Sequence, residues 1–353
     1  LNTHLGTAFY ILGLYVKMHF FPHPMSYDYS FNQIEIVGLT NIFSILSILF
    51  FICLSSYAVF ILYKSFKNRT ANPFSSIVAF GILFFLITLF LFSNLVLTIG
   101  TSMGDRLMYF PSLGFCIVIA ALLSKLPAFQ PSLDKNNKNI IPFGNLGIGI
   151  ALLIILPFSI KAYARNKDWK DNFTLYAHDV KIVPNSVKAH YYLGLELIKV
   201  QADAEQDPNK KKAFYEEGIL ELEKAVAILP TFSSAYTQMG VAFYRLKNFE
   251  KAIENYNKAS SLKPQDAITL NNIGTVYFEW GKYNEAAEKF SNAIQIDSRF
   301  VDAYMNLGSV YGTLNNYDKA IESFNSAIKN APDNARAYYY IAMTYQNLSL
   351  IHI

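Results

Sequence analysis

The chain has 353 residues, enough for two domains, and its average composition (52% hydrophobic, 16% charged) combines two different halves. Residues 1–164 hold 9 of the 30 Lys and Arg and 4 of the 26 Asp and Glu, whereas residues 165–353 carry the other 21 basic and 22 acidic residues. The net charge of +4 therefore forms no clustered basic face, which excludes a nucleic-acid-binding protein.

Apolar segments dominate the first half and predict a transmembrane domain over residues 1–164. A membrane-spanning helix needs about 20 mostly apolar residues. Five segments approach this requirement, and the predicted spans are residues 5–21, 38–63, 75–99, 107–123 and 142–162. The first is the weakest, because Lys17 interrupts it. Since the chain begins at Leu1 without a basic leader, we interpret the sequence as a fragment of a longer protein.

Loop charge predicts the orientation of these spans. The segment 64–72 has three basic residues and no acid, and the segment 125–139 has three lysines against Asp134. Basic loops face the cytoplasm, so the alternate loops 22–37 and 100–106 are expected on the opposite side. An alternating count then places everything after Ala162 on that side as well, in the ER lumen or the periplasm.

The second half is built from repeats of even length. Gly240, Gly274 and Gly308 are equally spaced and mark three consecutive units of two helices each, with aromatic and alanine positions recurring between them. This spacing and pattern are typical of tetratricopeptide (TPR) repeats, in which paired helices stack into a solenoid. After a connecting helix at 165–186, the predicted repeats are residues 187–232, 233–266, 267–300, 301–334 and a partial unit, 335–353. The first repeat is longer than the others, and the charged stretch 201–212 accounts for the excess.

One polar position recurs on the first helix of the three regular repeats. Gln238, Asn272 and Asn306 occupy the same place in successive units, so they are expected to form a row along the solenoid. A side-chain amide both donates and accepts hydrogen bonds, and such a row suits binding of an extended acceptor peptide. The alternative is that asparagine is simply common at this repeat position.

No soluble-enzyme signature is present. The glycines at 147 and 149 lie inside an apolar span, Gly104 precedes Asp-Arg instead of Lys-Ser, and the six histidines lack the spacing of metal ligands. Three polar clusters remain, and the predicted topology places all three on one side of the membrane. They are residues 23–30, residues 104–112 and residues 165–171.

These clusters, followed directly by TPR repeats, resemble the transmembrane and tetratricopeptide-repeat O-mannosyltransferases (the TMTC family) and their bacterial relatives. The resemblance covers essentially the whole chain. It rests on Met-Ser-Tyr-Asp28-Tyr-Ser, on Asp105-Arg106-Leu-Met-Tyr109-Phe-Pro-Ser-Leu-Gly-Phe-Cys, and on Arg165-Asn-Lys-Asp168-Trp169. It implies an all-α fold: the C-terminal part of a GT-C-like membrane bundle, followed by a TPR α-solenoid on the lumenal or periplasmic side.

The resemblance also implies a reaction. The protein would transfer a sugar, expected to be mannose, from a polyprenyl- or dolichyl-phosphate donor to Ser or Thr of proteins held by the repeats. Arg106, Asp105, Tyr109 and Asp28 are the candidate donor-phosphate residues, since a guanidinium fork suits a phosphate. The alternative for the Asp105–Arg106 pair is a structural anchor in the headgroup layer.

The catalytic residue itself remains unassigned. In this family the catalytic carboxylate lies in the first exoplasmic loop, which the resemblance places upstream of Leu1. No cofactor motif is evident, although a divalent metal or further basic groups could assist Arg106 in holding the departing phosphate. The competing hypothesis is a membrane-anchored TPR scaffold that recruits proteins without chemistry.

Overall fold

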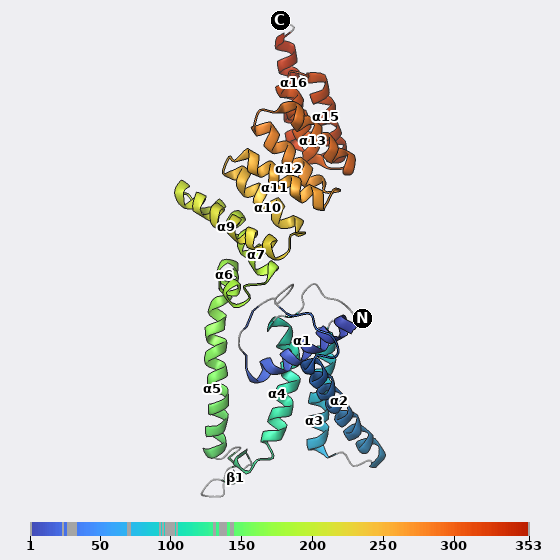
Figure 1. Ribbon diagram of the computed structural model, residues 1–353, viewed down its shortest axis with the longest axis vertical. Coiled ribbons are helices and arrows are strands. Elements are labelled where there is room, and N and C mark those ends of the chain that lie inside the picture. The colour runs from blue at the N-terminus through green and yellow to red at the C-terminus, as the bar shows by residue number, and fades with distance from the viewer. Residues whose placement is uncertain are drawn as a thin grey trace. The chain divides into compact units, whose positions relative to one another are not determined.

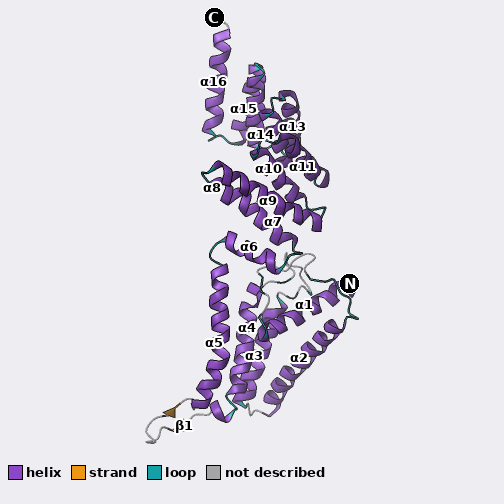
Figure 2. Cartoon of the chain, turned by 60° about the vertical axis from the view of Figure 1, so that its left-hand side comes forward, coloured by secondary structure: helices purple, strands orange, loops and turns teal. Residues whose placement is uncertain are grey.

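The computed structural model describes residues 2–22, 25–26, 34–68, 72–91, 93, 95, 103, 105–129, 132–133, 140–141 and 145–351. The chain divides into two compact units, Leu1–Ala189 and His190–Ile353, which are taken separately below. Helices make up both units, so the expected all-α class is confirmed. Figure 2 shows how completely helix dominates the described part of the chain. One two-residue ladder, β1 (Ser132–Leu133) with β2 (Ile140–Ile141), is antiparallel.

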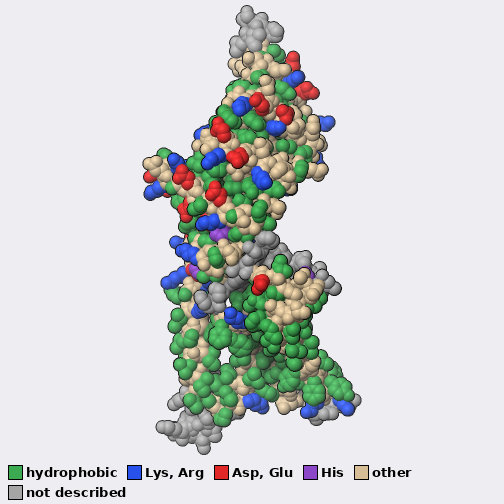
Figure 3. All heavy atoms as spheres, viewed as in Figure 1, with side chains coloured by type: hydrophobic (Ala, Val, Ile, Leu, Met, Phe, Trp, Pro, Cys, Tyr) green, Lys and Arg blue, Asp and Glu red, His purple; other side chains and the backbone are tan. Residues whose placement is uncertain are grey.

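The N-terminal unit contains six longer helices and two single 3-10 turns among its described residues. They are α1 (Asn2–Phe20), α2 (Ile42–Asn68), α3 (Pro73–Phe90), η1 (Asp105–Met108), α4 (Tyr109–Leu123), η2 (Pro127–Phe129), α5 (Asn145–Asp168) and α6 (Asn172–Ile182). By length and composition, α2, α3 and α5 suffice to cross a membrane, and α4 is a shorter apolar helix. Apolar side chains cover most of the visible surface of this unit (Figure 3).

Local side-chain hydrogen bonds shift several helix ends from the predicted spans. The helix expected over 38–63 begins at Ile42, because the Asn41 side chain caps it by accepting from the backbone N–H groups of Phe43 and Ser44. The helix expected to reach 99 ends at Phe90. There the Ser93 hydroxyl donates to the Phe90 carbonyl and accepts from the Leu95 N–H, a local alternative to helix continuation.

The predicted connecting helix at 165–186 is divided in the structure. Helix α5 runs past the expected end at 162 and continues to Asp168, and α6 begins separately at Asn172. The Asp171 carboxylate caps α6 by accepting from the Thr174 N–H at 2.7 Å. This hydrogen bond is the main cause that lowers the pKa of Asp171. The cap therefore fixes where α6 begins.

Small residues set the packing between helices of the N-terminal unit. A Cβ added to Gly114 of α4 would lie 2.6 Å from the Gly81 carbonyl oxygen and from the Phe85 backbone nitrogen of α3. The two backbones thus approach as closely as in membrane helix pairs built on small residues. On the other side of the bundle, the Ser44 hydroxyl of α2 donates to the Gly6 carbonyl of α1 at 2.8 Å.

The C-terminal unit is a stack of helix pairs (Figure 1). The three regular pairs are α10 (Ser233–Arg245) with α11 (Phe249–Leu262), α12 (Ala267–Glu279) with α13 (Tyr283–Ile296), and α14 (Val301–Thr313) with α15 (Tyr317–Asn330). A last helix, α16 (Ala335–Ile351), packs on α15. These pairs match the predicted repeat units, although the domain boundaries drawn from the sequence stay predictions.

Each regular pair uses the same contact and the same turn. A Cβ added to Gly240, Gly274 or Gly308 would meet a ring carbon of Tyr256, Phe290 or Phe324 within 2.6–2.7 Å, so glycine alone admits the ring. The turn between the paired helices has a left-handed residue at Lys247, Gly281 and Asn315, with φ of 59°, 78° and 59°. The repeat period is therefore present in both packing and backbone conformation.

The first repeat absorbs its extra residues mostly as helix. Its first helix, α7 (Val187–Glu196), continues through the π-turn η3 (Leu197–Gln201) and α8 (Ala202–Ala204). Its second helix, α9 (Pro208–Ile228), has 21 residues, against 14 in α11, α13 and α15. Asp207 caps α9 and Pro208 is its first residue. The charged insertion is thus a pair of helix extensions separated by the short segment 205–207.

Candidate functional site

A buried polar cluster lies where α5 ends and α6 begins. Arg165, in the last turn of α5, is 8% exposed, and its guanidinium lies over the Trp169 ring at 5.6 Å. Its Nη1 donates to the Asp168 carboxylate at 3.3 Å and to the Asp179 carboxylate of α6 at 3.4 Å. One cation therefore joins carboxylates from two helices across the turn that separates them.

His178 shares this cluster and completes a four-residue network. Its Nδ1 lies 3.1 Å from Arg165 Nη1 and 3.0 Å from Asp179 Oδ1, and its Nε2 lies 3.6 Å from Asp168 Oδ2. A neutral imidazole Nδ1 either accepts from Arg165 or donates to Asp179, so the ring's tautomer decides which bond forms. The network thus has two internal arrangements without any movement of heavy atoms.

A distant segment meets this cluster through Ser26. The Ser26 hydroxyl donates to Asp179 Oδ2 at 2.7 Å, and both residues are fully buried. Ser26 belongs to the first polar cluster of the sequence and Arg165 to the third, so two segments far apart in the chain meet at Asp179. The sequence predicted that these clusters share a side of the membrane, and the structure brings them into one hydrogen-bonded network.

The arrangement favours positioning over proton transfer. Both carboxylate oxygens of Asp179 accept hydrogen bonds, from Arg165 on one side and Ser26 on the other. A buried carboxylate whose two oxygens both accept hydrogen bonds is held in one position. Asp179 therefore anchors Ser26 to the α5–α6 corner. Asp179 and His178 were not identified as site residues from the sequence. The only signal in the sequence was an acidic residue on an otherwise apolar helix face.

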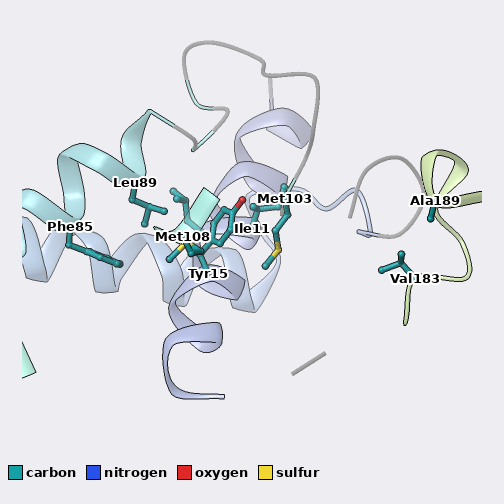
Figure 4. Packing of buried hydrophobic residues seen from close by; sticks show 9 residues of the cluster. Ile11, Tyr15, Phe85, Leu89, Met103, Met108, Val183 and Ala189 are labelled. Atoms are coloured by element: carbon teal, nitrogen blue, oxygen red, sulfur yellow. The ribbon is translucent and has the colours of Figure 1, made fainter. Parts of the chain in front are cut away.

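The second polar cluster is anchored by apolar contacts. Met103, which precedes η1, and Met108, the last residue of η1, are buried against Ile11 and Tyr15 of α1 and Leu89 of α3. Figure 4 shows these side chains converging around the Tyr15 ring. The backbone of residues 105 and 106 forms η1, between the two methionines. The packing of Met103 and Met108 against α1 therefore fixes the position of η1.

The predicted donor-phosphate residues are only partly within the described structure. Asp28 lies outside the described residues, and so do the side chains of Asp105 and Arg106. Tyr109 begins α4 with its side chain 82% exposed, and its ring lies 6.4 Å from that of Phe110. The assignment of Asp28, Asp105, Arg106 and Tyr109 to a donor-phosphate site stays a prediction.

The predicted amide row lies on the first helices of the three regular repeats. Gln238, Asn272 and Asn306 are half-buried on α10, α12 and α14. Asn306 Nδ2 donates to Asn271 Oδ1 of the preceding repeat at 3.0 Å, so one amide links two repeats. Gln238 Oε1 is buried and has no hydrogen-bond partner among the described residues. Asn271, beside the predicted row, was missed because the neighbouring repeats have no amide at its equivalent position.

Within the described residues, no three His, Cys, Asp or Glu side chains are arranged to hold a metal ion. Asp168, His178 and Asp179 come close together, but the Arg165 guanidinium lies among them and supplies the positive charge. A divalent metal, which the sequence left open, is therefore not assigned to this cluster.

Family models match the repeats. A TPR repeat model matches residues 243–280 and 274–315, and a tetratricopeptide repeat model matches residues 301–334. The crystal structure of MamA has 23% sequence identity and a TM-score of 0.41, and covers 49% of this chain and 94% of that one. The family models confirm that residues 243–334 form TPR repeats.

Curated relatives extend the similarity beyond the repeats. A protein O-mannosyl-transferase of Caenorhabditis elegans is 29% identical over 174 residues, which is 49% of this chain and 22% of the relative. The protein O-mannosyl-transferase TMTC1 of Mus musculus is 26% identical over 242 residues, which is 67% of this chain and 23% of the relative. The chain thus spans about a quarter of the length of these relatives or less.

The second of these alignments is the more informative. It includes more of this chain than the repeat region 187–353 alone contains, so part of the membrane half aligns as well. The predicted resemblance to the TMTC family is confirmed by this similarity: the chain is a TPR-containing homologue of the TMTC-type protein O-mannosyl-transferases.

Proposed function

We propose that this chain is part of a membrane-embedded glycosyltransferase that transfers mannose from a polyprenyl-phosphate donor to Ser or Thr of proteins bound by its repeats. The observation that carries the proposal is the alignment with protein O-mannosyl-transferases across both the repeats and part of the membrane half. The convergence of Ser26 and Arg165 on Asp179 supports it, because it builds a fixed polar corner beside the apolar helices.

In the proposed topology, the repeats and the polar corner face the ER lumen or the periplasm. The basic segments 64–72 and 125–139 face the cytoplasm. Three described helices are long and apolar enough to cross a membrane, which supports a multi-span protein, and the five predicted spans are part of the proposal. The donor would then approach from the membrane and the acceptor from the aqueous side.

The proposed reaction balances as a substitution at the anomeric carbon. The acceptor hydroxyl oxygen bonds to that carbon, the bond from the carbon to the donor phosphate oxygen breaks, and polyprenyl phosphate leaves. A carboxylate takes the hydroxyl proton, and we assign no such base in this chain. Arg106 would hold the departing phosphate, supported by Asp105, Tyr109 and Asp28 around it.

Replacing Arg106 tests this role in the intact membrane protein. Arg106→Lys keeps the charge but loses the planar fork, so donor use should fall, and Arg106→Ala should reduce it further. Arg299→Lys, an exposed arginine in the repeats, is the matched control. If both Arg106 variants keep the turnover and donor KM of the parent, Arg106 is a structural anchor and not a phosphate ligand.

The acceptor would lie along the amide row Gln238, Asn272 and Asn306. Replacing all three with Ala should weaken acceptor-peptide binding by roughly 1 kcal/mol per lost hydrogen bond. The exposed glutamates Glu254, Glu288 and Glu322 also recur once in each regular repeat, but on the second helices, and their triple replacement with Gln is the matched control. Calorimetry that finds unchanged affinity in the Ala variant would remove the row from the binding site.

A protein-recruiting scaffold is the second candidate function. It is favoured by one observation: TPR models match residues 243–280, 274–315 and 301–334, and stacked repeats of this kind form extended surfaces that bind other proteins. A scaffold would bind the acceptor proteins without modifying them. The transfer measurement that closes the Discussion separates the two functions.

A further inference from the structure

The helical insertion of the first repeat builds a cavity at the edge of the solenoid. Residues of α8 and of the first two turns of α9 form one wall, and the end of α10 with its following turn forms the other. The cavity has a volume of about 350 Å³. Sites for small molecules have volumes of roughly 300–1,000 Å³. The cavity is therefore large enough for a compact ligand.

Positive charge dominates the lining of this cavity. Four cationic side chains and one carboxylate face it: Lys211, Lys212, Arg245, Lys247 and Asp203. In the described part of the chain, neither Lys211 nor Arg245 has a carboxylate within ion-pair distance. Lys212 pairs with Glu216 at 3.7 Å and Lys247 with Glu279 at 3.2 Å, both on exposed surfaces where such pairs are weak. The cavity thus attracts an anion.

Lys247 occupies a backbone position that lysine disfavours. Its φ is 59°, in the left-handed region, and the equivalent turns of the next two repeats place Gly281 and Asn315 there. Glycine and asparagine adopt this conformation at lower cost than lysine does. The first regular repeat, which lies next to the insertion, therefore has Lys247 at the turn position where the next two repeats have Gly281 and Asn315.

Besides its cations, the cavity is lined by the Asp203 carboxylate, two tyrosines, Pro208 and Leu246. The buried Tyr215 hydroxyl donates to Asp203 Oδ1 at 3.3 Å, which positions an otherwise exposed carboxylate in the wall. A carboxylate has further lone pairs, so Asp203 can still accept from hydroxyl groups of a ligand. The half-buried Tyr244 adds a ring to the same lining.

We propose that this cavity binds a phosphorylated saccharide. A phosphate monoester carries about −1.5 to −2 charges at pH 7, which matches the excess of cations better than a single carboxylate does. Arg245 and Lys211 hold the phosphate, and the guanidinium fork suits its oxygens. Asp203 accepts from the sugar hydroxyls. Asp203 repels any anion, but sugar hydroxyl groups can donate to it, whereas the carboxylates of an acidic peptide cannot, so the lining favours the sugar phosphate.

The test is calorimetric titration of the detergent-solubilised intact protein with mannose 6-phosphate. Mannose, inorganic phosphate and an oligoglutamate peptide are titrated in parallel. Arg245→Gln and Lys211→Gln should each weaken binding of the sugar phosphate by roughly tenfold, the loss of one charge-assisted hydrogen bond. Lys258→Gln, an exposed lysine on α11 outside the lining, should leave it unchanged. Circular dichroism confirms that each variant is folded.

Asp203→Ala separates the two halves of the proposed ligand. It should weaken mannose 6-phosphate and leave inorganic phosphate binding equal or tighter, because it removes a hydroxyl acceptor and a negative charge together. Binding of the peptide without the sugar phosphate would overturn the proposal in favour of a peptide site. Absence of binding by every probe, or equal affinity for inorganic phosphate and sugar phosphate with no effect of Asp203→Ala, would also overturn it. None of these outcomes depends on glycosyl transfer.

Discussion

Two residues with oppositely charged side chains, Arg165 and Asp179, are buried at the α5–α6 corner of the N-terminal unit. Asp179 is fully buried, and Arg165 is its cationic partner at 3.4 Å. Removing one partner of a buried ion pair leaves the other charge without compensation, which typically costs about 3–5 kcal/mol. The corner therefore depends strongly on Arg165, which pairs with both Asp168 and Asp179.

Replacing Arg165 with Met should lower the thermal midpoint of the intact protein in detergent, because the Asp179 carboxylate loses its cation. Lys167→Met changes the same charge on the same helix at an exposed site, where the lysine lies over Tyr163 at 5.3 Å, and should have little effect. Thermal unfolding followed by circular dichroism makes the comparison. Equal midpoints for the two variants would show that the corner does not stabilise the fold.

A second buried pair, within the repeats, should make stability depend on pH. His190 of α7 and Glu221 of α9 are buried, and His190 Nδ1 lies 2.6 Å from Glu221 Oε2. Lys224 Nζ donates to the other carboxylate oxygen, Oε1, at 2.7 Å. Burial alone would raise the pKa of Glu221, but the hydrogen bonds from His190 and Lys224 outweigh it and hold the pKa below its ordinary value.

Because the folded pKa of Glu221 is depressed, its contribution is complete above the unfolded value, near 4.3, and is lost as the pH falls through the lower folded value. The unfolding midpoint of Glu221→Gln should therefore lie closer to that of the parent at acidic pH than at pH 7. Thermal unfolding of both proteins at several pH values between 3 and 7 measures this difference in unfolding midpoint. The difference should shrink over the pH range in which the Glu221 carboxyl titrates. A constant difference across this range would contradict the assignment.

Some residues of the candidate site could be predicted from the sequence, and others could not. The three polar clusters were visible because charged groups stood out between apolar segments, and two of them do meet. Asp179 was not predictable, because nothing in an isolated helix sequence indicates which face a distant Ser26 will cover. Asn271 was missed for a similar reason: its partner, Asn306, comes from the next repeat with a one-residue offset.

Glycines decide helix packing at the element scale, and α14 offers a matched pair. A Cβ at Gly308 would lie 2.6 Å from Cε1 of Phe324, whereas a Cβ at Gly312, one helical turn later on the same helix, would meet nothing within 4 Å. The same substitution should therefore have opposite effects at these two positions.

Gly308→Ala should destabilise the repeats by about 1–3 kcal/mol through overpacking. Gly312→Ala should stabilise them by up to about 1 kcal/mol, since alanine favours the helix over glycine. Denaturant unfolding of the intact protein, followed by the fluorescence of its repeat tryptophan Trp280, measures both. A destabilisation of equal size at both positions would contradict the packing described for α14 and α15.

Helices were predictable to the extent that their signals were local. The repeat period located the paired helices because glycine, alanine and aromatic positions recur in every unit. The end of α3 was not located, because an apolar run conceals the Ser93 hydrogen bonds that stop it. The insertion was recognised by its length and charge, but its helical conformation depends on the Asp207 cap and on packing against α10.

The proposed topology concerns the whole molecule and can be tested by labelling. In a background without Cys53 and Cys116, a cysteine at Lys67 should react with a membrane-impermeant reagent only from the cytoplasmic side. A cysteine at Ser261 of the repeats should react only from the opposite side. Labelling of both positions from one side would contradict the proposed orientation.

We propose that the protein to which this chain belongs transfers mannose to protein hydroxyl groups, and mass spectrometry can detect the product. An acceptor protein is incubated with the intact membrane protein and polyprenyl-phosphate mannose. We expect a hexose on Ser or Thr that is absent without the donor and is reduced by Arg106→Ala. If the folded protein binds the acceptor and its Ser and Thr remain unmodified in the presence of the donor, the protein is a scaffold and the claim is wrong.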